Sequence, residues 1–489
     1  MAVLPLACTL AVSAWAQKSL NEVVVSATRS EQPITDVVAD LSIADRQTIE
    51  RLGAASVADV LERLPGVTIT RNGGPASTSN VYLRGAEGRF TAVFVDGVRI
   101  DSQATGGASW NALPISQIDR IEVLRGPAAA VYGSDAMAGV IQIFTRQGEK
   151  GFFPSVRTGI GSNNTRELSA SLRGSDEVVD YALGLGTDRS DGFNAKPTGN
   201  PDRDGYRNES FSGRLGWKLN PDQKLELTLL DNRQKAGYDG FSAGQDDQAR
   251  SHLQTVGLNW NGRWSEDWST RVGVSRGNDR YETSPSTYLT ETQVDSWLLR
   301  NELRVGPGRL TVDLERREDQ LQNASTTPET TDRHQNAIAL GYGLRAGDHT
   351  LQLNARRDDD SEFGVHTTGS LAYGYALSRT LQLTGSAGTA FRAPTLFQRF
   401  SIYGTSDLKA ETARNVEVGL RWQEAASRAS VVVYRNRVKD LIDYVAGPGS
   451  CVNGLGDFAG CYGNTGRATY TGVTLAGGTK LGEVNLGAS

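Results

Sequence analysis

The sequence predicts an all-β transmembrane β-barrel with a mixed α/β domain, N-terminal to the strands, inside its lumen. The chain has 489 residues, too many for one ordinary compact core, whereas a barrel that encloses its own domain escapes that limit. No apolar run approaches the roughly 20 residues of a membrane helix. From residue 151 onward, apolar and polar residues alternate with a period of two, as in strands that cross a membrane.

Composition and charge narrow the class of partner. The mean hydropathy is −0.38 and 38% of the residues are hydrophobic, so the average composition is that of a water-exposed protein. Lysine and arginine number 51 and aspartate and glutamate 56, which gives a net charge of −5. A mildly acidic chain argues against a nucleic-acid partner.

The N-terminus has the pattern of an export signal. Residues 2–15 are apolar and small, and Ala14-Trp15-Ala16 before Gln17 is a signal-peptidase cleavage pattern that makes 1–16 the predicted signal peptide. The usual basic segment is missing, so we leave the true start of translation open. Export places the mature chain in an oxidising compartment.

The predicted export bears on the redox state of the cysteines. Cys8 leaves with the predicted signal, and Cys451 and Cys461 remain as a pair in a glycine-rich stretch. We predict a local disulfide between these two, with two free thiols as the alternative.

Residues 36–148 predict a small domain of mixed α and β structure. Ser56, with Asp59 three residues later, predicts a capped helix that Pro65-Gly66 ends. Asp96-Gly97 between two apolar runs predicts a two-residue hairpin. The predicted strands are 81–83, 91–95, 98–100, 121–124 and 139–145.

Residues 151–489 predict the barrel. Short turns such as Asn220-Pro221-Asp222 alternate with longer polar connections, and short turns on one rim with long loops on the other are typical of outer-membrane barrels. A soluble solenoid or propeller is the alternative, but it requires one fixed repeat length, and these spacings are irregular. The predicted long connections are 189–208, 235–250, 283–291, 321–331, 392–410 and 440–466.

Several of these stretches resemble TonB-dependent outer-membrane receptors, and among them the vitamin B12 (cobalamin) receptors. The N-terminal matches are NEVVVSAT at 21–28, SVADVLERLPGV at 56–67, VYLRG at 81–85, VFVDGVRI at 93–100 and IDRIEVLRGPAAAVYGSDAMAGVIQIFTR at 118–146. The barrel matches are RDDDSEFG at 357–364, GTAFRAPTL at 388–396, YRNRVKDLIDY at 434–444 and NTGRATYTGV at 464–473. The resemblance implies a plug domain inside the barrel and transport rather than catalysis.

The resemblance also divides the chain. It implies a signal peptide at 1–16, a TonB box and linker at 17–35, a plug at 36–148 and a transmembrane barrel at 151–489. Such receptors have barrels of about 22 strands, whereas this sequence predicts about sixteen and the start of another at 482–489. We therefore expect the C-terminal strands to be missing and the wall to be open beside the first strand, near 155–161.

A short strand near the N-terminus is the predicted TonB box. It comprises Asn21, Glu22, Val23, Val24, Val25, Ser26, Ala27 and Thr28. An exposed strand of this kind can join the sheet edge of a partner, and backbone hydrogen bonds across strands resist pulling. The implied partner is TonB, with its inner-membrane energising complex. A frayed terminus is the alternative.

Carboxylates gather in two neighbouring loops. Asp202 and Asp204 lie in one, and Asp239, Asp246 and Asp247 in the next. Converging carboxylates repel one another unless a cation neutralises them, and calcium prefers oxygen ligands in flexible sites. The resemblance adds Asn194, Asn200 and the backbone of Tyr238, although Asn194 stands where these receptors have an acid. The site would order the loops structurally; solvated loop acids are the alternative.

The resemblance places a cobalamin site between the outer plug loops and the barrel loops. The implied ligand residues are Thr78, Asn80, Glu87, Thr105, Gly106, Gly240 and Thr290. Several of these side chains differ from those of the receptors, so backbone contacts carry more of the expected binding.

The sequence therefore predicts TonB-dependent transport of cobalamin by a monomer in the outer membrane of a Gram-negative bacterium, in contact with its lipid. A ferric-siderophore receptor is the alternative. A passive porin would lack the plug and the TonB box. With four histidines and no Ser/His/Asp set or zinc motif, we expect neither an enzyme nor a catalytic cofactor, and a glycosidase would need two carboxylates flanking a sugar in a formed cleft.

Overall fold

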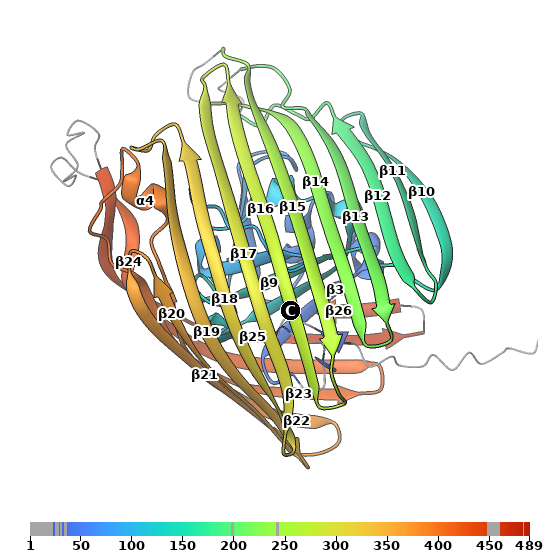
Figure 1. The fold of residues 1–489 in the computed structure, drawn as a ribbon. Coiled ribbons are helices and arrows are strands. Elements are labelled where there is room, and N and C mark those ends of the chain that lie inside the picture. The colour runs from blue at the N-terminus through green and yellow to red at the C-terminus, as the bar shows by residue number, and fades with distance from the viewer. Residues whose placement is uncertain are drawn as a thin grey trace, which may run out of the picture.

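The computed structural model describes residues 23–24, 29, 32–33, 37–196, 200–240, 244–446, 460–482 and 484–489. It is a tall curved sheet with a smaller domain against its inner face (Figure 1). The predicted signal peptide, Cys451 and all of the predicted TonB box except Val23 and Val24 lie outside the described residues. Within the described part of the chain, no helix is long and apolar enough to cross a membrane.

The smaller domain is the plug, and its centre is a five-stranded sheet in the order β3-β8-β9-β6-β7. The strands β4 and β5 form a separate pair. Along the chain the elements are β3 (Asp40–Asp45), α1 (Arg46–Leu52), α2 (Val57–Glu62), β4 (Val67–Arg71), β5 (Ser79–Leu83), η2 (Gly88–Phe90), β6 (Thr91–Val95), β7 (Val98–Arg99), η3 (Trp110–Ala112), η4 (Ile115–Gln117), β8 (Ile118–Arg125), α3 (Ala129–Tyr132) and β9 (Gly139–Thr145).

Local sequence signals in the plug form as predicted. The Asp59 N–H donates to Ser56 Oγ at 3.3 Å, and the Ser56 N–H donates to Asp59 Oδ2 at 2.9 Å, so the predicted capping box starts α2. Asp96 and Gly97 both have positive φ, 48° and 83°, as a tight hairpin turn requires. The hairpin joins β6 to β7.

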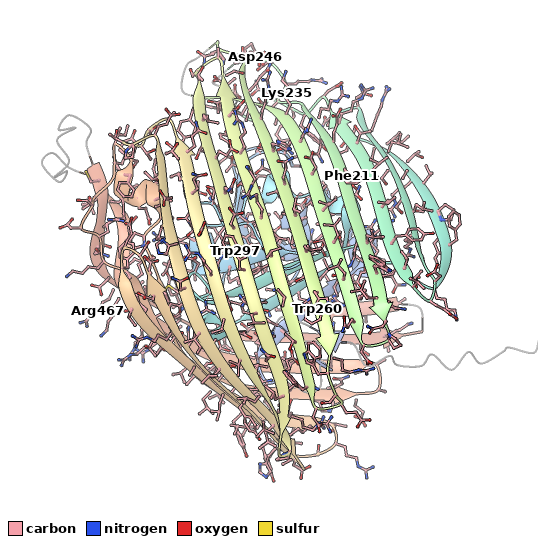
Figure 2. The ribbon with its side chains drawn as sticks, viewed as in Figure 1. Phe211, Lys235, Asp246, Trp260, Trp297 and Arg467 are labelled. Carbon is pink, nitrogen blue, oxygen red and sulfur yellow. The ribbon has the colours of Figure 1, made fainter. Side chains whose placement is uncertain are left out.

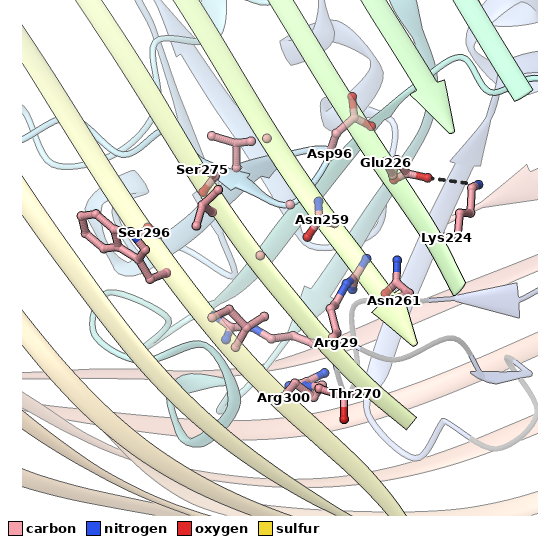
Figure 3. Close-up of a pocket in the computed structure, with 18 of the residues that line it drawn as sticks. Arg29, Asp96, Lys224, Glu226, Asn259, Asn261, Thr270, Ser275, Ser296 and Arg300 are labelled. Carbon is pink, nitrogen blue, oxygen red and sulfur yellow. Dashed lines mark hydrogen bonds and ion pairs between the residues drawn. The ribbon is translucent and has the colours of Figure 1, made fainter. Parts of the chain in front are cut away.

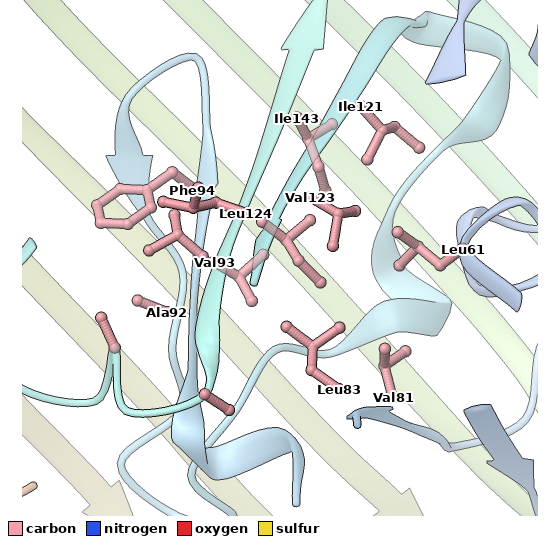
Figure 4. Packing of buried hydrophobic residues seen from close by; sticks show 14 of the residues in the cluster. Leu61, Val81, Leu83, Ala92, Val93, Phe94, Ile121, Val123, Leu124 and Ile143 are labelled. Carbon is pink, nitrogen blue, oxygen red and sulfur yellow. The ribbon is translucent and has the colours of Figure 1, made fainter. Parts of the chain in front are cut away.

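The plug core is apolar (Figure 4), and its cluster extends to residues of the barrel wall. Leu61, Val93 and Ile121 are fully buried at its centre. The same cluster includes Leu230 and Val438 from barrel strands. Burial of apolar surface across this boundary holds the plug in the lumen.

The barrel wall is one antiparallel sheet of 17 strands that follow one another in chain order from β10 to β26. Its strands are β10 (Gly151–Gly161), β11 (Thr165–Ser175), β12 (Val179–Ser190), β13 (Tyr206–Asn220), β14 (Gln223–Tyr238), β15 (Asp247–Arg263), β16 (Trp268–Ser284), β17 (Tyr288–Val305), β18 (Gly308–Asn323), β19 (Thr330–Ala346), β20 (His349–Asp360), β21 (Gly364–Ala376), β22 (Leu381–Arg392), β23 (Glu411–Glu424), β24 (Ser427–Ala446), β25 (Gly460–Leu481) and β26 (Val484–Ala488). The short helix α4 (Leu396–Phe400) lies between β22 and β23. Among the described residues β10 and β26 are the two ends of the order and do not pair with each other, so the expected open wall is confirmed.

The outer loops are shorter than the sequence predicts. The connection predicted at 283–291 is almost entirely strand, because β16 runs to Ser284 and β17 starts at Tyr288. Strands that rise above the membrane have water on both faces, so they continue without the apolar alternation by which a membrane strand is recognised. The polar outer ends of these strands therefore have the sequence pattern of loops.

The outer surface of the sheet fits a lipid layer. Trp260, Trp264 and Trp268 form a contacting aromatic series near the short turns, with ring centroids 5.8 Å apart in each pair. Figure 2 shows Trp297 midway along the strands and Lys235 and Asp246 near the long loops. An apolar band with aromatic residues at its margin is the surface of an outer-membrane barrel.

Candidate functional site

The predicted ligand residues of the plug lie in its outer loops, except Asn80, which lies in β5. Thr78, Asn80 and Thr105 are exposed. The loop that carries Thr105 is fixed to the wall because the Gln103 N–H donates to Thr292 Oγ1 on β17 at 3.0 Å. These residues therefore share the surface that the plug presents toward the long barrel loops.

Thr290 is brought to this surface by strand alternation. It lies two residues from Thr292 on β17 and so shares its inward face. In the described part of the chain, Thr290 Oγ1 is buried without a hydrogen-bond partner. A buried hydroxyl of this kind is a ready partner for a polar ligand group.

Gly106 can meet a ligand only through its backbone. Its φ of 66° is in the left-handed region, and a Cβ added there would lie 2.6 Å from Arg392 Nη2 and 3.0 Å from Arg89 Cβ. The close packing leaves no room for a side chain. That backbone groups carry much of the ligand contact stays a prediction.

An ion-pair chain missed by sequence reasoning lies beneath Glu87. Glu87 pairs with Arg89 at 2.8 Å, Arg89 lies 3.8 Å from Glu411, and Glu411 pairs with Arg392 at 2.8 Å. Glu411 and Arg392 are almost completely buried. The motif at 388–396 contains Arg392, but its partner comes from another strand, and nothing in the sequence indicates that pairing.

The two acidic loops meet as predicted. The Asn200 N–H donates to Asp239 Oδ1 at 3.0 Å, which joins the first loop to the second. Asn194 Nδ2 donates to the Asn200 carbonyl at 2.9 Å, and the Ala195 N–H donates to Asp204 Oδ2 at 3.0 Å. Backbone donors therefore hold two of the predicted carboxylates at one place on the outer rim.

Charge repulsion is visible at this place. Burial raises the pKa of Asp204, and the neighbouring carboxylates of Asp239, Asp202 and Asp246 raise it further. Repulsion among these carboxylates favours the protonated form of Asp204, and a bound cation would relieve the same repulsion.

The two neighbouring acids Asp246 and Asp247 have different environments. Asp247 is buried and accepts the Gly240 N–H at 3.0 Å, whereas Asp246 is exposed and accepts from Gln248 at 3.2 Å. Tyr238 is the last residue of β14. Among the described residues, no three His, Cys, Asp or Glu side chains are already arranged to hold a metal ion.

The plug contacts the acidic loops directly. A Cβ at Gly73 would lie 3.4 Å from Ala195 Cβ, and one at Gly74 would lie 3.7 Å from the Phe193 ring. The acidic loops and the outer plug loops thus form one continuous surface, so that order in one constrains the other.

The N-terminal segment lies on the side of the short turns, because Arg29 lines the same cavity as Pro221 and Asp222 of the β13–β14 turn. Of the predicted TonB box, Val23 and Val24 form β1 (Val23–Val24), which pairs with β2 (Gln32–Pro33). The sequence predicts a free strand, whereas this backbone is already paired within the chain. A partner strand must therefore displace β2 or add to the other edge.

Arg29, in the following linker, is held inside the barrel. Its guanidinium pairs with Glu315 on β18 and lies 4.5 Å from the centre of the Tyr132 ring of the plug. It lines a cavity of about 640 Å³ between the Asp96-Gly97 hairpin and the strands β14 to β18. Figure 3 shows Arg29 with Asn259 and Arg300 around this space.

A buried carboxylate fastens the plug to the wall. Asp135 pairs with Arg99 of the plug at 2.9 Å and with two barrel residues, Arg317 at 3.1 Å and Arg392 at 3.5 Å. Burial raises the pKa of Asp135, but Arg317, Arg99 and Arg392 together lower it more, to about 2. The carboxylate is therefore charged at neutral pH.

Cys461 is fully buried and disulfide-bonded. Its partner falls outside the described residues, so the pairing with Cys451 stays a prediction.

A plug held in a lipid-facing wall, with acidic and ligand loops on one rim and the N-terminal strand at the other, is the architecture of a gated outer-membrane receptor. The model "TonB-dependent Receptor Plug Domain" matches residues 33–140, and "TonB dependent receptor-like, beta-barrel" matches residues 152–489. The chain belongs to the TonB-dependent receptors, which are transport proteins of the outer membrane that work with TonB on a ligand.

Similar curated proteins include two named "Vitamin B12 transporter BtuB". The protein from Photobacterium profundum is 30% identical over 99% of this chain and 80% of its own length. The one from Vibrio vulnificus is 29% identical over 88% of this chain and 72% of its own length.

Solved structures share the fold. The siderophore receptor PirA from Pseudomonas aeruginosa superposes with a TM-score of 0.77 at 23% identity, over 91% of this chain and 84% of its own. A mutant of the ferric enterobactin receptor PfeA from Pseudomonas aeruginosa also has a TM-score of 0.77, at 21% identity, over 94% and 80%. At these identities the likeness concerns the fold alone.

Proposed function

We propose that this receptor transports cobalamin across the outer membrane in a TonB-dependent, calcium-assisted cycle, as a monomer. The convergence of two acidic loops against the outer plug loops carries the proposal, because it couples a cation site to the ligand surface. The relatives named as vitamin B12 transporters support the same ligand. The predicted signal peptide at 1–16 directs the chain to the envelope.

The acidic loops fit calcium in their chemistry. All the predicted donors are oxygens, and calcium takes six to eight oxygen ligands at flexible sites. They are the carboxylates of Asp202, Asp204, Asp239, Asp246 and Asp247, the amides of Asn194 and Asn200, and the backbone carbonyl of Tyr238. The side chains are not arranged as a finished ligand set among the described residues. Calcium would thus draw the two loops together and fix the edge of the ligand surface, in competition with the backbone donors that now hold Asp204 and Asp239.

Ligand binding rests on this chain's own groups. The buried Thr290 hydroxyl and the backbone of Gly106 offer polar contacts, and Glu87 offers a carboxylate that is already paired with Arg89. The plug blocks passage until it moves. The predicted TonB box at 21–28 gives TonB a strand to pair with, and the pull passes to the plug through Arg29, which contacts both the wall and Tyr132.

The test is equilibrium binding of radiolabelled cyanocobalamin to outer membranes that contain the receptor, with calcium and with a chelator. We expect chelation to weaken binding at least tenfold. The triple variant Asp202→Asn, Asp204→Asn, Asp239→Asn should bind weakly under both conditions, because amides do not attract the cation as carboxylates do.

The matched control is Asp222→Asn, an acid in a short turn on the far rim, which should keep calcium dependence. Wild-type affinity that is unaffected by chelation would mean that the loop acids are merely solvated. Binding of ferric enterobactin in place of cobalamin would favour the ferric-siderophore alternative.

A further inference from the structure

Four aromatic side chains form a connected group at the outer rim beside the plug. Phe397 lies in α4, Tyr403 in the loop after it, Tyr444 near the outer end of β24 and Tyr462 near the start of β25. The ring centroids are 6.2 Å apart for Phe397 and Tyr462, and 5.9 Å apart for both Tyr403–Tyr444 and Tyr444–Tyr462, all edge to face. We call these four residues the aromatic wall.

The aromatic wall is attached to the plug loop that carries two predicted ligand residues. The Phe397 N–H donates to the Gln103 carbonyl at 3.2 Å, and Leu396 packs in one cluster with Ala104. Thr105 and Gly106 follow directly in the chain. The aromatic wall therefore adjoins the ligand surface of the plug.

The aromatic wall faces the lumen and remains open to solvent. Ile442 on β24 is fully buried, and its N–H donates to Glu411 Oε1 at 2.8 Å. Tyr444 lies two residues farther along the same strand and thus on the same face, with 45% of its surface exposed. Tyr462 is the direct strand partner of Tyr444 on β25 and so shares its face.

The wall is held rigidly by the backbone. The Tyr462 N–H donates to the Tyr403 carbonyl at 2.9 Å, which ties β25 to the loop after α4. The Thr327 N–H donates to the Phe400 carbonyl at 2.9 Å, which ties that segment to the loop between β18 and β19. A preorganised aromatic surface binds with a smaller loss of conformational entropy than a mobile one.

The chemistry of the wall differs from that of the acidic loops. It offers uncharged rings and phenolic hydroxyls, and aromatic side chains with a few polar groups are typical of small-molecule sites. The acidic loops connect β12 to β13 and β14 to β15, whereas the wall lies on β24, β25 and the β22–β23 connection. The two surfaces therefore border the plug from different parts of the sheet.

We infer that the aromatic wall is a ligand-contacting surface, which takes the flat conjugated face and amide-bearing edge of a corrinoid. The rings supply apolar contacts to the conjugated macrocycle, and the tyrosine hydroxyls supply hydrogen bonds to its amide groups. The identity of the ligand rests on the proposed cobalamin function. The position of the contact rests on the geometry of the wall alone.

The test compares Tyr444→Ala, Tyr462→Ala and the double variant with the wild type in equilibrium binding of radiolabelled cyanocobalamin to outer membranes that contain the receptor. Each lost ring should weaken binding about three- to tenfold, and the double variant more than either. Tyr444→Phe keeps the ring and should lose less than Tyr444→Ala. Tyr373→Ala, which removes an exposed tyrosine of β21 outside the wall, should bind as the wild type.

The outcomes separate the two claims. If the wild type binds cobalamin and both alanine variants bind it equally tightly, the wall is not a contact surface although the proposed function stands. If the wild type binds ferric enterobactin instead and the same variants weaken that binding, the cobalamin assignment falls while the wall remains a ligand contact. Unchanged binding by Tyr444→Phe shows that a loss in Tyr444→Ala is due to the ring and not to the hydroxyl.

Discussion

At the scale of single residues, the plug is held by a few buried charges. Asp135 forms ion pairs with three arginines that come from the plug and from two barrel strands. Removal of one member of a buried ion cluster leaves the others without compensation. Plug seating therefore depends on Asp135.

We predict that Asp135→Asn weakens plug seating by about 3–5 kcal/mol, the usual cost of breaking a buried pair. The measurement is the denaturant concentration at which plug amides lose protection from hydrogen exchange. The matched control is Asp222→Asn, whose partner Arg263 is exposed, and it should cost less than about 1 kcal/mol. Equal protection in the Asp135 variant and the wild type would contradict the role.

The same carboxylate gives a pH dependence of known sign. The pKa of Asp135 is lowered from 3.8 to about 2, so its contribution to stability is complete above pH 3.8 and is lost as the pH falls through about 2. In Asp135→Asn this acid loss should be absent. A wild-type plug whose protection does not change between about pH 4 and pH 2 would contradict the assignment.

A glycine in the barrel strand β16 sets how closely the plug can approach the barrel. A Cβ at Gly277 would lie 2.3 Å from the Arg99 carbonyl oxygen of β7, so Gly277→Ala must displace the plug or the strand. We expect a loss of about 1–3 kcal/mol in plug stability, as for overpacking in a core. Gly343→Ala is the control because nothing lies within 4 Å of its added Cβ; equal stability of the two variants would contradict the close contact.

At the scale of elements, the pairing of β1 with β2 bears on energy coupling. Val24→Pro removes a backbone N–H and fixes φ, which should abolish strand pairing with TonB. Uptake should be lost while surface binding of the ligand persists, as measured by radiolabelled ligand with and without energised cells. Val24→Ala keeps the N–H and should transport; normal uptake by the proline variant would refute the coupling role.

Elements governed by adjacent residues were predicted well. The capping box at Ser56 and the hairpin at Asp96-Gly97 depend on side chains and torsions within four residues, and both form as predicted. The strand alternation in the barrel likewise predicted the sheet, and the strand count compared with the resembled receptors predicted its open edge. By contrast, α4 was predicted as loop, although Thr395 and Gln398 form a capping box at its start, which is a local signal that the sequence analysis missed.

The candidate site was predicted only in part, because many of its contacts join residues that are distant in the chain. The convergence of the acidic loops follows from strand order, and Asn200 does bond to Asp239. The aromatic wall joins Phe397 to Tyr462 across two strands and a loop, and no local pattern indicates which tyrosines will share a face. Pairings between distant residues need the register of the strands, which the sequence leaves undetermined.

At the scale of the whole molecule, the two rims have different tasks. The outer rim gathers the acidic loops, the plug loops and the aromatic wall, whereas the other end holds β1, Arg29 and the inner cavity. The plug lies between them, packed against the wall by apolar residues and by the Asp135 cluster. A pull on the N-terminal strand therefore acts on the element that separates ligand from exit.

The most direct test of the central claim is uptake of radiolabelled cyanocobalamin by cells that have this receptor as their only cobalamin receptor, with TonB present or deleted. The account predicts uptake that requires TonB and that excess unlabelled cobalamin, but not ferric enterobactin, competes away. Surface binding without TonB should remain. Absence of cobalamin uptake, together with TonB-dependent uptake of a ferric siderophore, would contradict the account.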